Sequence, residues 1–292
     1  MVQRKTKAVF NVLGLLGYPL GHSLSPVMHE AALKKNGLQG TYIPVEIEPK
    51  RFREFMKAFR LLPFTGVNVT VPYKEKVMPF LDELSRDAKA IGAVNTIVRK
   101  GKKLVGHNTD VHGFLFSLKK DLRFEPKGKT IFLLGAGGAA RAVVYGLAKE
   151  KASVIFIADR MYAKAKKLGD DFALLFPKTT IVVIKENEDS YKKILAECDL
   201  LINATPCGLK KKDPSVVPAK LLPKKKLYVY DLIYNPANTG LTKLATRRQW
   251  PCANGVGMLA YQGAVAFSLW TGKKEPLLVM RKALEAALKK KK

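Results

Sequence analysis

A glycine-rich turn gives the clearest chemical signal in the sequence. Gly135, Gly137 and Ala140 fit the pattern G-x-G-x-x-A between an apolar run at residues 130–134 and a helical pattern at residues 141–149. In such turns the first glycine allows the bend, the second lets the backbone approach a pyrophosphate, and a small third residue allows close packing. The helix N-terminus adds N–H donors and a positive dipole end. The pattern predicts a dinucleotide site, although the same turn also occurs without a ligand.

The residues after the next predicted strand bear on which dinucleotide such a site takes. Asp159 stands 24 residues after Gly135, where an acidic side chain would bind the ribose 2′-hydroxyl of NAD. Arg160 follows, and it would pair with the 2′-phosphate of NADP. The two signals conflict, because a carboxylate that faces a 2′-phosphate repels it unless the side chain turns away. Lys164 and Lys166 add positive charge nearby, and the balance favours NADP.

Polar clusters in the amino-terminal part end predicted strands or follow them. In open α/β sheets the ligand crevice lies at the carboxyl ends of the strands, so we expect these clusters to form a second site. Ser23 and Ser25 flank one residue, and both hydroxyls could face one oxyanion. Ser25 with Pro26 could equally start a helix, with Ser25 as its N-cap. The clusters are residues 17–29 (GYPLGHSLSPVMH), 66–74 (GVNVTVPYK), 92–96 (GAVNT) and 106–113 (GHNTDVHG).

Lys74 and Asp110 are a candidate proton donor and its orienting partner. Lys74 follows Pro72 at the end of a predicted strand, and Asp110 stands in a predicted loop. Brought together at a cofactor, an ammonium and a carboxylate would serve acid–base chemistry. Spacing alone does not distinguish this pair from ordinary solvated loop charges.

The elements that must position these residues alternate between strands and helices. The alternation predicts an α/β fold of two units, with a boundary near residues 115–125 and a linker or helix–strand connection at 121–129. Residues 96–99 and 104–107 flank a glycine-containing turn and predict a hairpin. Other strands are expected at residues 12–16, 41–45, 66–71, 130–134, 153–158, 180–184, 200–204 and 227–232, and helices at 25–36, 50–59, 75–80, 82–90, 141–149, 163–176, 258–271 and 276–288.

Composition limits the class of protein. With 292 residues, 47% hydrophobic and 26% charged, the chain resembles a soluble globular protein of about two domains. The net charge is +28 at pH 7, which attracts anions. The lysines are spread along the chain and no aromatic residues interleave them, so a generally basic surface is favoured over a nucleic-acid-binding face.

Cysteine usage and the amino terminus indicate a cytoplasmic protein. Cys198, Cys207 and Cys252 form no CxxC pair, which argues against a disulfide framework and a zinc site. The start, MVQRKTKAVFNVLGLL, resembles a signal peptide weakly, and a first strand is the favoured interpretation. No apolar stretch reaches the roughly 20 residues that a membrane-spanning helix needs.

The motifs together resemble the shikimate dehydrogenase family over nearly the full length of the chain. Eight motifs in the family's order make the match specific, whereas a glycine-rich turn alone would not. They are G-x-P-x-x-H-S-x-S-P-x-x-H (17–29), N-V-T-V-P-Y-K (68–74), G-A-V-N-T (92–96), N-T-D-x-x-G (108–113), G-A-G-G-A-A-R (135–141), N-A-T-P-x-G (203–208), Y-D-x-x-Y-x-P (230–236) and G-x-G-M-L-x-x-Q-G-A (255–264).

The resemblance implies a fold and an activity. It implies an α/β substrate-binding domain at residues 1–115, a Rossmann-like NADP-binding domain at 116–252, and carboxy-terminal helices at 253–292 that return to the first domain. The activity would be reversible NADPH-dependent reduction of 3-dehydroshikimate to shikimate, a step toward chorismate and aromatic amino acids. We expect a monomer or homodimer, with no metal, no membrane and no specific nucleic acid as a partner.

The resemblance also assigns roles to matching positions. Lys74 and Asp110 would be the catalytic pair, with Lys74 stabilising the substrate oxygen on which hydride transfer builds charge. The substrate-binding residues would be Ser23, Ser25, Thr70, Asn95, Tyr234 and Gln262. The cofactor-binding residues would be Gly135, Ala136, Gly137, Gly138, Ala139, Ala140, Asp159, Arg160, Lys164, Thr205, Leu232, Gly255 and Met258.

Departures from the family pattern keep some alternatives open. Asp159-Arg160-Met161 stands where the family usually has Asn-Arg-Thr, so NAD stays possible as the cofactor. Leu209 stands where Met is more usual, which suggests a packing change. Both serines of S-x-S are present, which favours shikimate over quinate. A bifunctional quinate/shikimate dehydrogenase is the nearest alternative; a catalytically silent sensor and a basic nucleic-acid-binding Rossmann protein are more distant.

Overall fold

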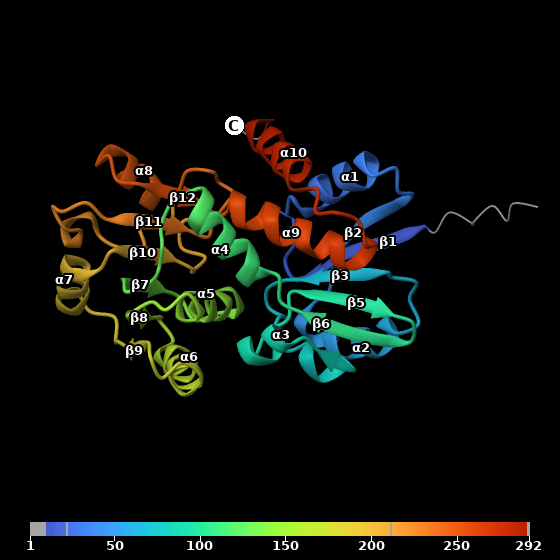
Figure 1. Ribbon diagram of the computed structural model, residues 1–292, viewed down its shortest axis with the longest axis horizontal. Coiled ribbons are helices and arrows are strands. Elements are labelled where there is room, and N and C mark those ends of the chain that lie inside the picture. Colours follow the sequence, from blue (N-terminus) through green and yellow to red (C-terminus); the bar gives the residue numbers. More distant parts are fainter. Residues whose placement is uncertain (1–9, 22, 211, 291–292) are drawn as a thin grey trace, which may run out of the picture. The chain divides into compact units, whose positions relative to one another are not determined.

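The computed structural model describes residues 10–21, 23–210 and 212–290 (Figure 1). Contacts divide them into two compact units. The first comprises the described residues up to Thr109 together with Gly263–Ala287, and the second comprises Asp110–Gln262 and the described residues from Leu288 onward. The basic residues of the segment that resembles a signal peptide lie outside the described residues. Its apolar part leads into the first strand.

A mixed sheet forms the centre of the first unit. Strands β1, β2 and β3 are parallel, whereas β5 is antiparallel to both β3 and β6. The carboxyl ends of β1, β3 and β6 and the amino end of β5 therefore lie at one edge of the sheet. Among the described residues the strand order is β2 (Gly40–Glu46), β1 (Asn11–Gly17), β3 (Gly66–Val69), β5 (Thr96–Lys100), β6 (Lys103–His107) and β4 (Glu83–Leu84). The pairing of β5 with β6 confirms the predicted hairpin.

The helices of the first unit end and begin at recognisable signals. Helix α1 (Ser25–Lys35) is followed by Gly37, which has a φ of +62° and confirms the predicted stop. Helix α2 (Phe52–Phe59) follows a 3₁₀ turn at Pro49–Arg51. The end of α9 (Val256–Thr271) and most of α10 (Leu277–Lys290) also belong to this unit.

The segment between β3 and β5 differs from the sequence prediction. Residues 75–80 form turns and a 3₁₀ helix at Met78–Phe80 rather than an α-helix, because Pro79 lacks an N–H and disfavours the α conformation of the residue before it. Residues 82–90, predicted as one helix, contain β4 and then α3 (Arg86–Ile91). The Ser85 hydroxyl accepts a hydrogen bond from the Ala88 amide at 3.2 Å, which starts the helix there.

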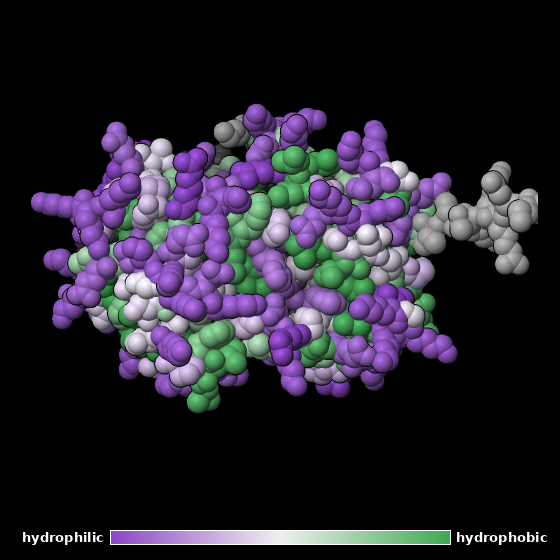
Figure 2. Space-filling view, viewed as in Figure 1, coloured by the Kyte–Doolittle hydropathy of each residue, from purple (hydrophilic) through white to green (hydrophobic). Residues whose placement is uncertain are grey.

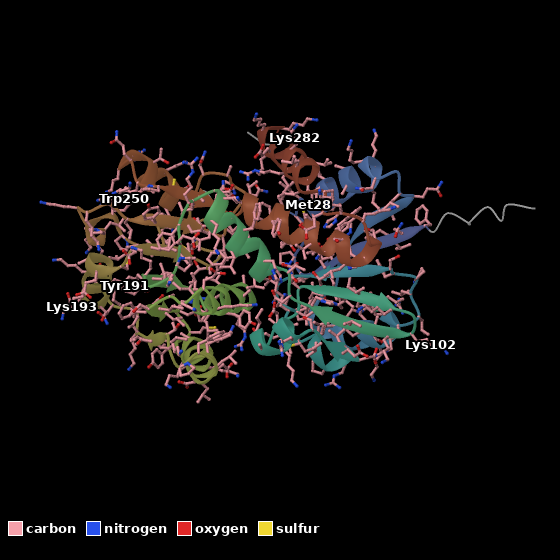
Figure 3. All side chains as sticks on the ribbon, in the orientation of Figure 1. Met28, Lys102, Tyr191, Lys193, Trp250 and Lys282 are labelled. Carbon is pink, nitrogen blue, oxygen red and sulfur yellow. The ribbon has the colours of Figure 1, made fainter. Side chains whose placement is uncertain are left out.

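The core of the first unit encloses a histidine. His29 on α1 is fully buried, and neither of its ring nitrogens meets the distance and angle criteria of a hydrogen bond to any described residue. Its ring stacks on Tyr42 with centroids 4.3 Å apart. Burial disfavours the charged imidazolium and lowers the pKa of His29 to about 3. The neighbouring Met28, labelled in Figure 3, is buried as well.

His29 should make the protein acid-sensitive. The unfolded chain takes up a proton near pH 6.5 that the folded chain takes up only near pH 3, so stability is present above pH 6.5 and is lost as the pH falls. Between pH 7 and pH 5 this loss is about 2 kcal/mol. In a His29→Phe variant the loss should disappear, which urea unfolding at the two pH values would measure.

The comparison uses the change with pH rather than the absolute stability, so any constant repacking cost of the larger ring cancels. His112→Gln, at an exposed position of α4, is the matched control. Parallel loss of stability in wild type and His29→Phe would contradict the assignment.

A parallel sheet forms the centre of the second unit. Among the described residues its order is β12 (Cys252–Asn254), β11 (Tyr228–Asp231), β10 (Leu200–Asn203), β7 (Thr130–Leu134), β8 (Val154–Ala158) and β9 (Thr180–Val183). Counted from β7, this is the doubly wound order 3-2-1-4-5-6. The order reverses between β7 and β10, and a ligand crevice is expected at the carboxyl ends of these strands.

Several elements of the second unit were not predicted. They are α4 (Asp110–Lys120), α7 (Glu188–Glu197), α8 (Gly240–Arg247) and β12. The predicted helices correspond to α5 (Gly138–Lys149), α6 (Tyr162–Leu175) and the first part of α9. Tyr191 and Trp250, labelled in Figure 3, contribute to one core cluster of this unit. The predicted domain limits at residues 115 and 252 differ from the division by contacts, and as functional limits they stay predictions.

Glycines allow α4 and α9 to approach closely. A Cβ atom on Gly113 of α4 would lie 2.6 Å from the Met258 carbonyl oxygen of α9. A Cβ atom on Gly257 of α9 would lie 1.9 Å from a carboxylate oxygen of Asp121 and 2.5 Å from the Ser117 hydroxyl. Side chains at either position would therefore force the two helices apart.

The surface is strongly basic, and hydrophilic side chains spread over the visible face of both units (Figure 2). Leu209 is half exposed, and the packing change expected at this position stays a prediction. Among the described residues, no helix is long and apolar enough to cross a membrane. The cytoplasmic location stays a prediction.

Candidate functional site

The polar clusters of the first unit meet at one edge of its sheet. Ser23 and Ser25 follow β1, Thr70 and Lys74 follow β3, and Asn95 precedes β5. The strand directions place these three segments at the same edge, as the sequence predicted. Backbone hydrogen bonds join them directly, since the Thr70 amide donates to Leu16 of β1 at 2.8 Å.

Ser23 and Ser25 stand at the start of α1, but not in the predicted capping arrangement. The helix begins at Ser25 itself, its N-cap position is Leu24, and no side chain caps it. The Ser25 amide donates instead to the Ser23 hydroxyl oxygen at 3.2 Å. Ser25 as N-cap is therefore wrong, because the turn closes one residue earlier. The uncapped helix start still offers a positive dipole end to an anion.

Lys74 is held by its backbone. It lies in the turn after β3, where the Tyr73 amide donates to Thr70, and its own carbonyl accepts from the Val94 amide at 2.8 Å. This bond ties the turn to the segment that carries Asn95. Lys74 itself is half-buried.

Asn95 is the centre of a buried hydrogen-bond network. Its side-chain oxygen accepts from the Thr109 amide at 2.7 Å and from the Thr96 hydroxyl at 3.0 Å, and its amide donates to the Thr109 hydroxyl at 2.9 Å. Asn68 donates to both the Asn95 carbonyl and the Thr96 hydroxyl. The network fixes Thr109, which immediately precedes Asp110 in the chain.

The glycine-rich turn of the second unit lies at the topological switch point. Gly135 has a φ of +112°, and a Cβ atom there would lie 2.8 Å from the Ala204 carbonyl group after β10. The loops after β7 and β10 are therefore in direct contact. Gly137 is different, because a Cβ atom on it would meet no atom of the described part of the chain within 4 Å. Packing within the protein does not require a glycine at this position.

The loop after β8 gives Asp159 and Arg160 different surroundings. One carboxylate oxygen of Asp159 accepts from the Ala136 amide at 2.8 Å, and the other accepts from the Met161 amide at 2.7 Å. Arg160 and Lys164 are exposed. The carboxylate thus faces the backbone of the protein, and the cations face solvent.

Asn203 and Asp231 join the loops after β10 and β11. Asn203 donates to the fully buried carboxylate of Asp231 at 3.0 Å, and its side-chain oxygen accepts from the Thr205 hydroxyl at 2.7 Å. Asp231 also accepts from the Thr239 hydroxyl at 2.7 Å and from the Ile233 amide at 3.1 Å. Burial raises the pKa of Asp231, and these hydrogen bonds oppose the shift.

The remaining predicted residues of the second unit lie after β11 and β12 and along α9. A Cβ atom on Gly255 would lie 2.0 Å from the carbonyl oxygen of Leu232, so glycine is required there by packing. Met258 is buried, and the Gln262 side chain donates to the Leu259 carbonyl at 3.0 Å. Tyr234 is half-buried in the loop after β11.

The second unit fits a dinucleotide. The open space at Gly137, the N-terminus of α5 without a side-chain cap and the exposed Arg160 provide a close backbone approach, N–H donors and a cation. Lys74 belongs to the first unit and Asp110, which begins α4, to the second. Among the described residues, no group of His, Cys, Asp and Glu side chains could hold a metal ion, and the three cysteines are free.

Sequence reasoning missed the residues that support the site. Asn68, Thr109, Asn203 and Asp231 are buried polar side chains in or next to apolar strands. A polar residue inside an apolar strand was the available signal, because burial requires it to find a partner. Arg141 was also missed; it pairs with Asp171 at 2.9 Å and links α5 to α6.

The fold and the site together define a class. A doubly wound unit with an open glycine turn, next in the chain to an α/β unit with a lysine and hydroxyl cluster at a sheet edge, is the arrangement of a dinucleotide-dependent dehydrogenase. Three family models match: the shikimate dehydrogenase substrate binding domain over residues 15–97, shikimate/quinate 5-dehydrogenase over 118–231, and the shikimate 5′-dehydrogenase C-terminal domain over 255–285.

The chain belongs to the shikimate dehydrogenase family. The shikimate dehydrogenase (NADP+) of Halothermothrix orenii is 46% identical over 92% of this chain and 93% of its own. A structure of the Thermus thermophilus shikimate 5-dehydrogenase with NADP(H) and shikimate has a TM-score of 0.83 at 36% identity, covering 95% of this chain and all of that one. The quinate dehydrogenase of Corynebacterium glutamicum with NAD has a TM-score of 0.85 at 30% identity, with 95% and 100% covered.

Proposed function

We propose that the protein is an NADP-dependent shikimate dehydrogenase that reversibly reduces 3-dehydroshikimate to shikimate. The observation that carries this proposal is the gathering of Ser23, Thr70, Lys74 and Asn95 at one sheet edge from three separate segments. These are the positions that match the motifs of the family's substrate-binding domain, and relatives that span nearly the whole chain are named for this activity.

The first unit would hold the substrate through its acid group and its ring oxygens. Ser23 and Ser25, at the uncapped start of α1, suit a carboxylate, because a hydroxyl donor and a positive dipole end act on the same anion. Thr70 and Asn95 would bind ring oxygens. Tyr234 and Gln262 are further substrate-binding candidates, on their motif matches alone. The hydrogen bonds of Asn95 within the protein fix its orientation before any substrate binds.

Lys74 would act on the oxygen that is reduced. NADPH would supply the hydride when bound. As negative charge builds on the substrate oxygen, the Lys74 ammonium stabilises it and donates a proton, so the oxygen ends as a hydroxyl. Asp110 would be the second catalytic residue, on the match of its N-T-D-x-x-G motif to the family. In the oxidative direction Lys74 takes the proton back.

Initial rates of shikimate oxidation with NADP and with NAD, and with quinate as a second substrate, test the proposal. Rapid reduction of NADP with shikimate is the expected result. Equal rates with quinate would indicate a bifunctional enzyme, which the similarity to a quinate dehydrogenase makes the second candidate. No activity with either cofactor would overturn the assignment.

Arg160 should determine the preference for NADP. In an Arg160→Ala variant kcat/KM for NADP should fall by about 10- to 100-fold, because a charge-assisted contact to the 2′-phosphate is lost. The value for NAD, which has no such phosphate, should change little. Lys167→Ala, which removes an exposed cation of α6, is the control. A loss of equal size with both dinucleotides would contradict this role.

A further inference from the structure

Asp159 occupies the position from which an acidic side chain would bind the ribose of NAD, yet its two oxygens are already engaged. One accepts from the Ala136 amide, inside the glycine-rich turn, at 2.8 Å. The other accepts from the Met161 amide, beyond β8, at 2.7 Å. Both distances are those of strong charge-assisted hydrogen bonds.

These two bonds connect separate parts of the dinucleotide site. Ala136 stands between the two glycines that the pyrophosphate would approach, and Met161 follows the arginine that would bind the 2′-phosphate. The Gly135 amide donates to the Ala158 carbonyl at 2.8 Å. The bond from Ala136 to the Asp159 carboxylate is a second connection between the same two segments, one residue further along each. Beyond this link the turn continues into the open position at Gly137.

We infer that Asp159 is a positioning residue that joins the glycine-rich turn to the Arg160 segment, and not the ribose ligand of an NAD-preferring site. This inference rests on the proposed function for the identity of the cofactor. It explains why a carboxylate beside a phosphate site is compatible with NADP. The charge is compensated by two backbone N–H groups, and the arginine next to it stays exposed.

The chemistry requires a carboxylate rather than an amide. An asparagine has one side-chain oxygen and one NH₂ group, so it can accept from one of the two amides and would present a donor to the other. An alanine can accept from neither. The side chain at position 159 therefore accepts from two backbone amides as aspartate, from one as asparagine and from none as alanine.

Binding of NADPH and NADH without substrate, followed by nicotinamide fluorescence, tests this role in the full-length protein. NADPH affinity should fall by about tenfold in Asp159→Asn and further in Asp159→Ala, since each lost bond costs about one power of ten. NADH affinity should fall as well, because both dinucleotides use the same turn. Amide hydrogen exchange at Ala136 and Met161 should accelerate in the same order.

A ribose ligand would give the opposite sign for NADPH. If Asp159→Asn weakened NADH while NADPH affinity stayed equal or rose, the inference would be overturned. Asp170→Asn removes an exposed carboxylate of α6 that is paired only with Lys166 in the described contacts, and so controls for the change of charge. The binding assay needs no shikimate. If the protein binds dinucleotides but does not turn over shikimate, the proposed function fails, whereas the role of Asp159 in dinucleotide binding is still measured.

Discussion

Replacing Lys74 by methionine should lower kcat for shikimate oxidation by about 10²- to 10⁴-fold, the usual contribution of a positioned acid–base group. The methionine chain keeps much of the lysine's length and packing, but it can neither donate a proton nor stabilise the charge on the substrate oxygen. KM for shikimate should change much less than kcat, because the substitution leaves the proposed carboxylate-binding residues, Ser23 and Ser25, unchanged. Steady-state rates at saturating NADP measure both constants.

The turn that carries Lys74 offers its own control. Lys76 stands two residues later and is exposed, so Lys76→Met removes the same charge from the same turn. Its kcat should stay near that of the wild type. If Lys74→Met retained near-normal turnover, the proton would have to come from another group and the assignment of the catalytic pair would be wrong.

Two alanine substitutions in the glycine-rich turn should separate folding from cofactor binding. Gly137→Ala should leave thermal stability unchanged, since its Cβ atom meets no atom of a described residue within 4 Å and its φ of −83° suits any residue. NADPH affinity should nevertheless fall by about 10- to 100-fold, because the new methyl group occupies the side from which a pyrophosphate would approach. Thermal unfolding and fluorescence titration provide the two measurements.

Gly135→Ala, by contrast, should lower the stability of the second unit even without cofactor. Its φ of +112° and the Ala204 backbone 2.8 Å from the new Cβ atom should destabilise the unit by about 2 kcal/mol or more, before any ligand is added. If the Gly137→Ala protein bound NADPH with normal affinity, the pyrophosphate would not approach the turn from the side on which Gly137 leaves open space.

The strands were predictable from local sequence because their signals are local. Residues 130–134 and 153–158 are continuous apolar runs, which suit strands buried on both faces of a parallel sheet. The ends of these strands carry the glycines, Asp159 and Arg160, so strand direction alone placed the proposed dinucleotide residues at one edge of the sheet. The resemblance to a family then supplied roles that spacing could not.

Helix α4 shows where local signals fail. Its first turns read as a loop, because Gly113 and the polar residues around it interrupt the apolar period. The glycine is required by contact with α9, some 145 residues later in the chain, and that contact is invisible in a local window. The helix forms because tertiary packing outweighs its weak local propensity.

The positions of charges were the least predictable part of the site. Asp159 and Arg160 are neighbours in sequence, and either could have faced a cofactor. Only the direction of the carboxylate, toward the Ala136 and Met161 amides, distinguishes the two interpretations. Backbone amides carry no sequence signature, so no pattern of residue types could have revealed these partners.

The buried carboxylate of Asp231 makes two cofactor-side loops mutually dependent. Through Asn203 it holds the loop that contains Thr205, and through Thr239 it holds the loop that contains Tyr234. A substitution that shifts one loop disturbs the acceptor that the other shares. When substrate preference evolves on this scaffold, we therefore expect the effects of changes in the two loops to depend on one another rather than to add.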